Sequence, residues 1–198
     1  GSSRAARQFT GGYNHLLGEV KAGFTLPELM VVIAILSFLA ALAIPQWSAT
    51  STEVRVWLWQ RELSSSLERA RTHSLSYAVP VTVCGGTAQG GCSTDGWRAG
   101  WITFEDPSGK RSCAGLNEQG SCTDHPGKVL ELGRGASAGL KVIGNHNVRH
   151  GVHYSPEHWG IAPGTFTACQ DQQQLGRVII SRSGRVRRAA GIDEPCPN

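Results

Sequence analysis

An arginine-rich segment near the C-terminal end is the strongest candidate for binding chemistry in this sequence. From Leu175 onward the chain holds five arginines against two carboxylates, a local charge of +3 in a chain of net charge +4: Arg177, Arg182, Arg185, Arg187 and Arg188. A guanidinium group is planar, and its paired donors match the oxygens of a phosphate. This segment therefore predicts contact with a phosphate-bearing partner.

The arginines are spaced as the two arms of a hairpin would require. Ser183 and Gly184 form a typical turn pair, and period two then places Arg185 and Arg187 on one face of the returning strand, about 7 Å apart. With Arg182 and Arg188 nearby, these groups could bind successive phosphates of a nucleic acid backbone. The alternative is a solvated strand face, or salt bridges to a neighbouring subunit.

A second unusual residue is Glu28, which lies inside an apolar run. Residues 29–44 are apolar except for Ser37, and extension back to Phe24 gives about 21 residues, enough to cross a bilayer as a helix. An ionisable group in such a segment costs at least ~2.5 kcal/mol and implies a partner or a function. The basic residues before the run, with Lys21 nearest, favour a cytoplasmic N-terminal flank.

The junction Lys21-Ala22-Gly23-Phe24-Thr25-Leu26-Pro27-Glu28 closely resembles the prepilin peptidase site of type IV pilins and type II secretion pseudopilins. This resemblance implies a leader over 1–23, cleavage between Gly23 and Phe24, and methylation of the new Phe24 amine. It also implies that Glu28 pairs with the N-terminus of a neighbouring subunit during filament assembly. The alternative is a secretory signal peptide cut after Ala41-Leu42-Ala43.

Six cysteines follow this segment, and none forms a C-x-x-C pair: Cys84, Cys92, Cys113, Cys122, Cys169 and Cys196. Downstream of a membrane-targeting segment, an even number favours disulfides in an oxidising periplasm. Local spacing suggests Cys84 with Cys92 and Cys113 with Cys122. Cys169 and Cys196 would then clamp the C-terminal tail, although six cysteines allow 15 pairings.

The elements that must carry these residues begin with a long helix. The apolar segment 24–44 is expected to span the membrane and to continue as an amphipathic helix to about residue 76, because buried-type residues recur at three- and four-residue steps: Val56, Trp59, Leu63, Leu67, Ala70 and Ser74. Pro45 would kink this helix without ending it, since the periodicity resumes.

From residue 77 to 198 we expect a β-rich periplasmic head. Short runs of period-two or β-branched residues alternate with Gly, Pro, Asn and Asp clusters: 81–84, 101–104, 129–132, 140–143, 152–154, 165–169 and 177–181. The predicted fold class is therefore α+β, a long N-terminal membrane-spanning helix packed on an antiparallel β-rich globular head.

The head itself resembles the FimT/GspH family of minor pilins and pseudopilins, through the stretch from Cys84 to Cys92 and through Trp97–Asp106. Gly184, Arg185 and Arg187 match the Gly-Arg-x-Arg motif of FimT-like competence pilins, which are implicated in binding DNA for natural transformation. The resemblance leaves three functions open: a DNA-binding minor pilin, a pseudopilin of type II secretion, or a structural minor pilin that primes pilus assembly.

Other chemistries have little support in the sequence. There is no Walker-type phosphate loop, and no Ser-His-Asp arrangement stands out from chance, so we expect neither an enzyme nor a cofactor. His146, His150, His153 and His158 cluster, but the glycine, asparagine and proline residues around them favour surface histidines over a metal site. The expected partners are other pilins in a filament, the prepilin peptidase and the inner membrane, with DNA as a further possible ligand.

Overall fold

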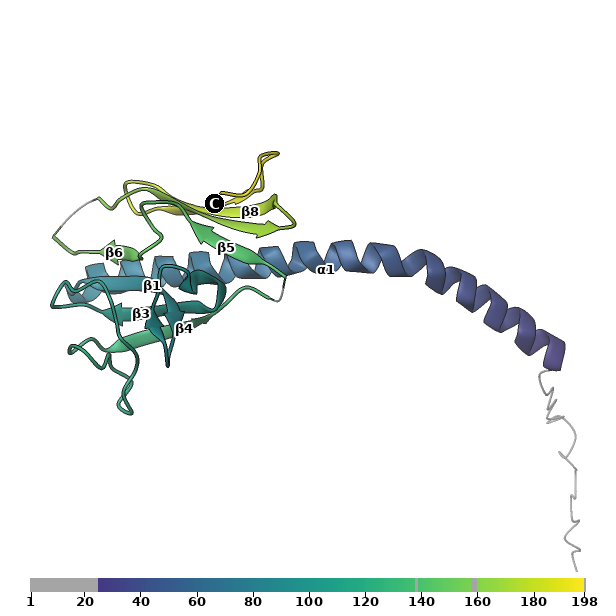
Figure 1. The fold of residues 1–198 in the computed structure, drawn as a ribbon, viewed down its shortest axis with the longest axis horizontal. Helices are drawn as coiled ribbons and strands as arrows, with labels where there is room; N and C mark the ends of the chain where they lie inside the picture. Colours follow the sequence, from purple (N-terminus) through teal and green to yellow (C-terminus); the bar gives the residue numbers. More distant parts are fainter. Residues whose placement is uncertain (1–24, 138, 158–159, 198) are drawn as a thin grey trace, which may run out of the picture. The chain divides into compact units, whose positions relative to one another are not determined.

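A computed structural model describes residues 25–137, 139–157 and 160–197, with side chains 40–50 outside the described set. One long helix precedes a β-rich region (Figure 1). The elements are α1 (Leu26–Tyr77), β1 (Val81–Thr87), β2 (Gly91–Cys92), the short 3-10 helix η1 (Gly96–Arg98), β3 (Gly100–Glu105), β4 (Val129–Arg134), β5 (Lys141–Gly144), β6 (Val152–Tyr154), β7 (Gly164–Gln170), β8 (Gln173–Ile180) and β9 (Val186–Ala190).

Helix α1 continues through Pro45 to Tyr77, as the resumed periodicity predicted. The chain divides into two units, Gly1–Pro45 and Gln46–Asn198. Among the residues that the structure describes, no helix is long and apolar enough to cross a membrane. Part of the predicted span of 24–44 lies outside that set, namely Phe24 and the side chains of residues 40–44. The predicted leader, 1–23, lies outside it entirely.

One face of the C-terminal half of α1 forms the centre of the core. Its buried residues are those that the helical spacing predicted: Val56, Trp59, Leu63, Leu67, Ala70 and Ser74. The five apolar ones belong to a single cluster that includes Val83 of β1 and Phe166 of β7, so this face of α1 packs against both sheets. Burial of this stripe is the main force that holds the helix on the strands.

The strands form two antiparallel sheets. The first has the order β2-β1-β3-β4. Strand β6 pairs with the start of β1, on the edge whose other end pairs with β2. The second sheet has the order β5-β7-β8-β9. In β3, Trp101 belongs to the core cluster around α1, whereas Ile102 and Phe104 belong to a second cluster with the cysteines of the 106–128 loop. The first sheet is therefore covered on both faces.

The six cysteines pair as their local spacing suggested. The disulfides are Cys84–Cys92, Cys113–Cys122 and Cys169–Cys196. The first closes the β1–β2 hairpin, the second lies within the loop that covers Ile102 and Phe104, and the third ties the C-terminal tail to β7. Each bond restricts the unfolded chain, so each contributes to the stability of the head.

Candidate functional site

The arginine-rich segment forms a hairpin of β8 and β9, as expected, but its turn has three residues where two were predicted. The chain reverses through Arg182, Ser183 and Gly184: the Gly184 N–H donates to the Ser181 carbonyl (2.9 Å), and the Ser181 N–H donates to the Arg185 carbonyl (3.0 Å). Gly184 has φ +77°, the left-handed conformation that ends such a three-residue loop and favours glycine. Ser183 and Gly184 are therefore only part of the turn.

The turn and β9 set the directions of the arginine side chains. Val186 is buried and faces the core, while Arg185 and Arg187 on either side of it are exposed. Arg187 pairs with Ile179 across the hairpin. Arg185 lies between the three-residue turn and the strand, because β9 begins at Val186. The alternation keeps the two guanidinium groups on the side of β9 away from the core.

None of these arginine side chains is used internally. Among the residues that the structure describes, the guanidinium groups of Arg182, Arg185, Arg187 and Arg188 make neither a hydrogen bond nor an ion pair. By contrast, Arg69 of α1 forms an ion pair with Glu131, as an arginine with a structural role would. The hairpin therefore exposes four cations that no described group neutralises.

The sheet around the hairpin reinforces this charge. Strands β5, β7, β8 and β9 contain no Asp or Glu, and their charged residues are all cationic: Lys141, Arg177, Arg187 and Arg188. Asp193 and Glu194 follow in the tail and line a different groove, of about 510 Å³, together with Thr52 and Gln174. The charged side chains of the four strands therefore favour the association of an anion, although Glu68 of α1 lies in a groove with Arg187 and Arg188.

Gln60 of α1 fixes the hairpin to the helix. Its side-chain amide, 8% exposed, donates to the carbonyl of Arg177 (3.0 Å) and to the carbonyl of Ala189 (2.7 Å). One side chain thus ties both strands of the hairpin to α1. Sequence reasoning missed this residue, because a polar group on the buried stripe shows its purpose only when its partners, more than 100 residues away, are in place.

Arg71 is a second residue that the sequence did not single out. Its side chain lies against Gly184, so that a Cβ atom at Gly184 would stand 3.1 Å from Arg71 Nε. The helical pattern placed Arg71 among the polar residues of α1 but could not indicate that it would meet the arginine turn. The turn therefore rests on a further cationic side chain.

The predicted assembly residues lie in the first unit. Glu28 is in the first turn of α1, and every described side chain from Thr25 to Leu39 is exposed. Ten large apolar residues in this stretch are 42% or more exposed: Leu26, Leu29, Met30, Val31, Val32, Ile33, Ile35, Leu36, Phe38 and Leu39. A helix that is apolar all round requires an apolar environment or a partner. Gly23 and Phe24 lie outside the described residues.

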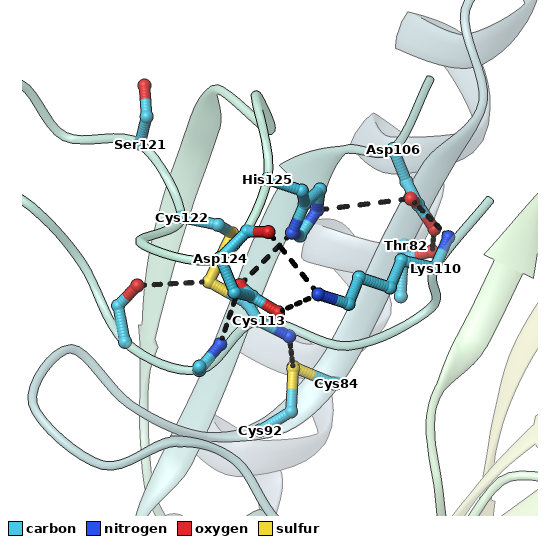
Figure 2. The surroundings of a disulfide bond; sticks show 12 residues. Thr82, Cys84, Cys92, Asp106, Lys110, Cys113, Ser121, Cys122, Asp124 and His125 are labelled. Atoms are coloured by element: carbon cyan, nitrogen blue, oxygen red, sulfur yellow. Dashed lines mark hydrogen bonds and ion pairs between the residues drawn. A yellow bond between two sulfur atoms is a disulfide. The ribbon is translucent and has the colours of Figure 1, made fainter. Parts of the chain in front are cut away.

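A buried polar cluster holds the long loop between β3 and β4 (Figure 2). Asp106 is fully buried and accepts hydrogen bonds from Thr82 Oγ1 (2.9 Å) and from the backbone N–H groups of Lys110 and Arg111 (both 2.8 Å). Lys110 Nζ lies 2.8 Å from Asp124, and this contact, with the Ala114 N–H, holds the pKa of Asp124 well below its usual range. The cluster is a structural support for the loop.

The histidines do not converge. His146 lies in the turn region after β5, His150 is exposed and His153 is on β6 with its Nδ1 2.9 Å from Thr82 Oγ1, while His158 lies outside the described residues. Across the described part of the chain, no three His, Cys, Asp or Glu side chains are close enough to hold a metal ion.

Comparison with known proteins finds two matching family models and a similar fimbrial protein. The family model described as "Type II transport protein GspH" matches residues 60–184, and the model described as "Prokaryotic N-terminal methylation motif" matches residues 20–44. The type IV major fimbrial protein FimA of Dichelobacter nodosus is 30% identical over 132 residues, which is 62% of this chain and 78% of that protein.

Two crystal structures of the type IV minor pilin FimU from Pseudomonas aeruginosa are also similar. Each is 16% identical; one covers 73% of this chain and 98% of its own with a TM-score of 0.48, the other 70% and 98% with a TM-score of 0.45. The GspH model alone spans well over half of the 198 residues. The chain therefore belongs to the GspH family and is a pilin-like or pseudopilin-like subunit with an N-terminal methylation motif.

Proposed function

We propose that this chain is a minor type IV pilin that binds DNA through its β8–β9 hairpin and serves in DNA uptake during natural transformation. The observation that carries the proposal is the group of four unpaired guanidinium groups around one turn: Arg182, Arg185, Arg187 and Arg188. They stand on a sheet whose strands carry no carboxylate. Such a surface suits the phosphate backbone and has no feature that would read bases, so binding is independent of sequence.

The N-terminal segment would deliver this hairpin to the outside of the cell. In the proposal, the prepilin peptidase cuts between Gly23 and Phe24, the Phe24 amine is methylated, and residues 24–44 anchor the subunit in the inner membrane as a single span with the head in the periplasm. Glu28 then pairs with the N-terminus of another pilin in the filament, which offsets the cost of burying both charges. The match to the methylation motif and the exposed apolar helix support this sequence of events.

The direct test is a DNA-binding measurement on the double variant Arg185→Gln with Arg187→Gln. We expect the wild-type chain in detergent to bind duplex DNA with a slope of log K against log salt of about −3.6, the value for four neutralised phosphates. The variant should lose two of these contacts, so its slope should become shallower by about 1.8, to about −1.8. Its affinity should drop at least tenfold at low salt.

The matched control is Arg98→Gln with Arg134→Gln. Both arginines are exposed, and they lie on η1 and β4, away from the hairpin. This variant loses the same charge but should keep most of the affinity. Equal loss in the two variants would mean that only net charge matters, and unchanged binding by the hairpin variant would remove DNA as its ligand.

A second function is favoured by the description of the matching family as a type II transport protein. As a pseudopilin, the chain would use the same arginines to bind carboxylates of a neighbouring subunit. In that case the hairpin variant would fail to co-assemble with its partner subunits, and its DNA affinity would equal that of the Arg98/Arg134 control.

A further inference from the structure

A small cavity lies directly beneath the arginine turn. It has a volume of about 80 Å³, is partly open, and is lined by residues of α1, of the end of β6 and of the turn itself, with Leu75, Pro156 and Ile161 as its apolar part. The polar residues that line it, with the turn glycine, are Arg71, Ser74, Tyr154, Ser155, Ser183 and Gly184. Since one water molecule occupies about 30 Å³ in the liquid, the cavity has room for a group larger than a single water.

Tyr154 lines this cavity and has an unused donor. Its side chain is only 3% exposed, and its hydroxyl has no hydrogen-bond partner among the residues that the structure describes. Buried polar groups are nearly always hydrogen-bonded, so an unpaired hydroxyl indicates a missing partner. Burial raises the pKa of Tyr154, which keeps the hydroxyl protonated and able to donate.

Arg71 brings a positive charge to the same place. Its side chain lies under Gly184, and its guanidinium group has no hydrogen-bond or ion-pair partner in the described part of the chain. Gly184 has no side chain, so Arg71 can approach the turn closely. Glu68, one helical turn earlier, is exposed and lines the groove beside Arg187 and Arg188. Its charge also acts on Tyr154: burial raises the pKa of this hydroxyl most, Arg71 lowers it and Glu68 raises it.

We propose that this cavity is a phosphate subsite, in which Arg71 and Tyr154 bind one phosphate of a nucleic acid that crosses the arginine hairpin. A phosphate oxygen accepts the hydroxyl proton of Tyr154, and others accept from the guanidinium fork of Arg71. Arg182, the first residue of the turn, and Arg185, which follows the turn, contact the neighbouring phosphates. The inference rests on the proposed function for the identity of the ligand, but the site consists of different residues.

The test uses the full chain in detergent with inorganic phosphate as the probe, titrated at constant ionic strength set with sodium chloride. Phosphate should raise the Tm of the wild-type protein, because a ligand that binds only the folded state stabilises it. Tyr154→Phe removes one oxygen that has no partner, so the variant should fold at least as well as the wild type without ligand. It should lose the phosphate-dependent rise, as should Arg71→Gln.

Two controls are built into the chain. Tyr77→Phe changes an exposed tyrosine on the same helix and should respond to phosphate as the wild type does. Arg98→Gln with Arg134→Gln removes two exposed charges on η1 and β4, away from the cavity, and should also keep the phosphate response. A wild-type Tm that is unmoved by phosphate, or a rise that persists in Tyr154→Phe, would overturn the subsite.

DNA binding by the same variants separates this inference from the proposed function. Tyr154→Phe and Arg71→Gln should each weaken duplex DNA binding at least tenfold, because each removes a contact to a phosphate that is shielded from water. If they lose the phosphate response and keep full DNA affinity, nucleic acid is not the ligand of the cavity and the inference falls. If Arg185→Gln with Arg187→Gln keeps its DNA affinity while the two cavity variants lose theirs, the proposed role of the hairpin is wrong. The phosphate titration then still shows whether the cavity binds phosphate.

Discussion

Asp124 shows at the scale of one residue how the long loop between β3 and β4 is held. Its carboxylate accepts a hydrogen bond from the Ala114 N–H (3.0 Å) and lies 2.8 Å from Lys110 Nζ. The Lys110 contact is the first cause of its lowered pKa, and partial burial opposes it only weakly. The folded protein therefore favours the charged carboxylate more than the unfolded chain does.

This shift predicts a particular pH dependence. A carboxyl group whose pKa is lowered by folding stabilises the protein above its unfolded pKa, about 3.8, and that stabilisation is lost as the pH falls toward the folded pKa. Asp124→Asn should therefore lower the free energy of unfolding at pH 7 and flatten its decline below about pH 4. Urea unfolding at a series of pH values measures both effects.

The control for this experiment is Asp95→Asn, which removes an exposed carboxylate that makes no side-chain cap at η1. It should leave the acid decline as steep as in the wild type. An Asp124→Asn protein with an unchanged acid decline would show that the loop does not depend on this charge.

At the scale of elements, the attachment of the arginine hairpin to α1 depends on Gln60. The variant Gln60→Met keeps the length of the side chain and removes the donor shared by the Arg177 and Ala189 carbonyls. Losing these two buried hydrogen bonds should cost about 2 kcal/mol of stability, although each carbonyl keeps its partner in the β8–β9 ladder. Urea unfolding gives the total, and hydrogen exchange should be faster in β9 than in β1.

Gln89→Met is the matched control, because Gln89 is exposed in the β1–β2 turn. It should change stability by less than about 0.5 kcal/mol. Equal effects of the two substitutions would mean that the amide of Gln60 does not hold the hairpin.

Elements with a strong period were predictable from the sequence. The buried stripe of α1 follows from residues three and four apart, such as Leu63 and Leu67, and the runs around Val83 and Phe166 have the β-branched and aromatic residues of strands. Local cysteine spacing also indicated Cys84–Cys92 and Cys113–Cys122, which left Cys169 and Cys196 as the third pair. These features depend on neighbours within a few residues, which is the range that a sequence pattern reports.

Features that depend on tertiary packing were not predictable in the same way. Strand β2 has only two residues, too few to show any period. A glycine with positive φ, such as Gly184, suits a two-residue turn as well as a three-residue turn, so the sequence does not distinguish the two. Arg71 and Tyr154 are 83 positions apart, so their meeting under the turn is a result of the fold.

At the scale of the whole molecule, the two units should behave differently in water. The apolar side chains of residues 26–39 are exposed, whereas the unit Gln46–Asn198 contains the packed core. We expect a chain that begins at Gln46 to be folded and monomeric without detergent, and the full chain to associate or to partition into detergent. Circular dichroism and sedimentation velocity would check this, and a full chain that is monomeric in plain buffer would contradict it.

The order in which the chain visits its two sheets has a mechanical consequence. After β4 the chain enters the second sheet with β5, returns to the first with β6 and leaves it again with β7. Each disulfide closes within one sheet, its covering loop or the tail, so no sulfur bridge joins the two layers in the described chain. A pulling force on the arginine turn is therefore transmitted between the two sheets by the backbone and by the apolar face of α1. Reduction of the disulfides would leave both connections unchanged.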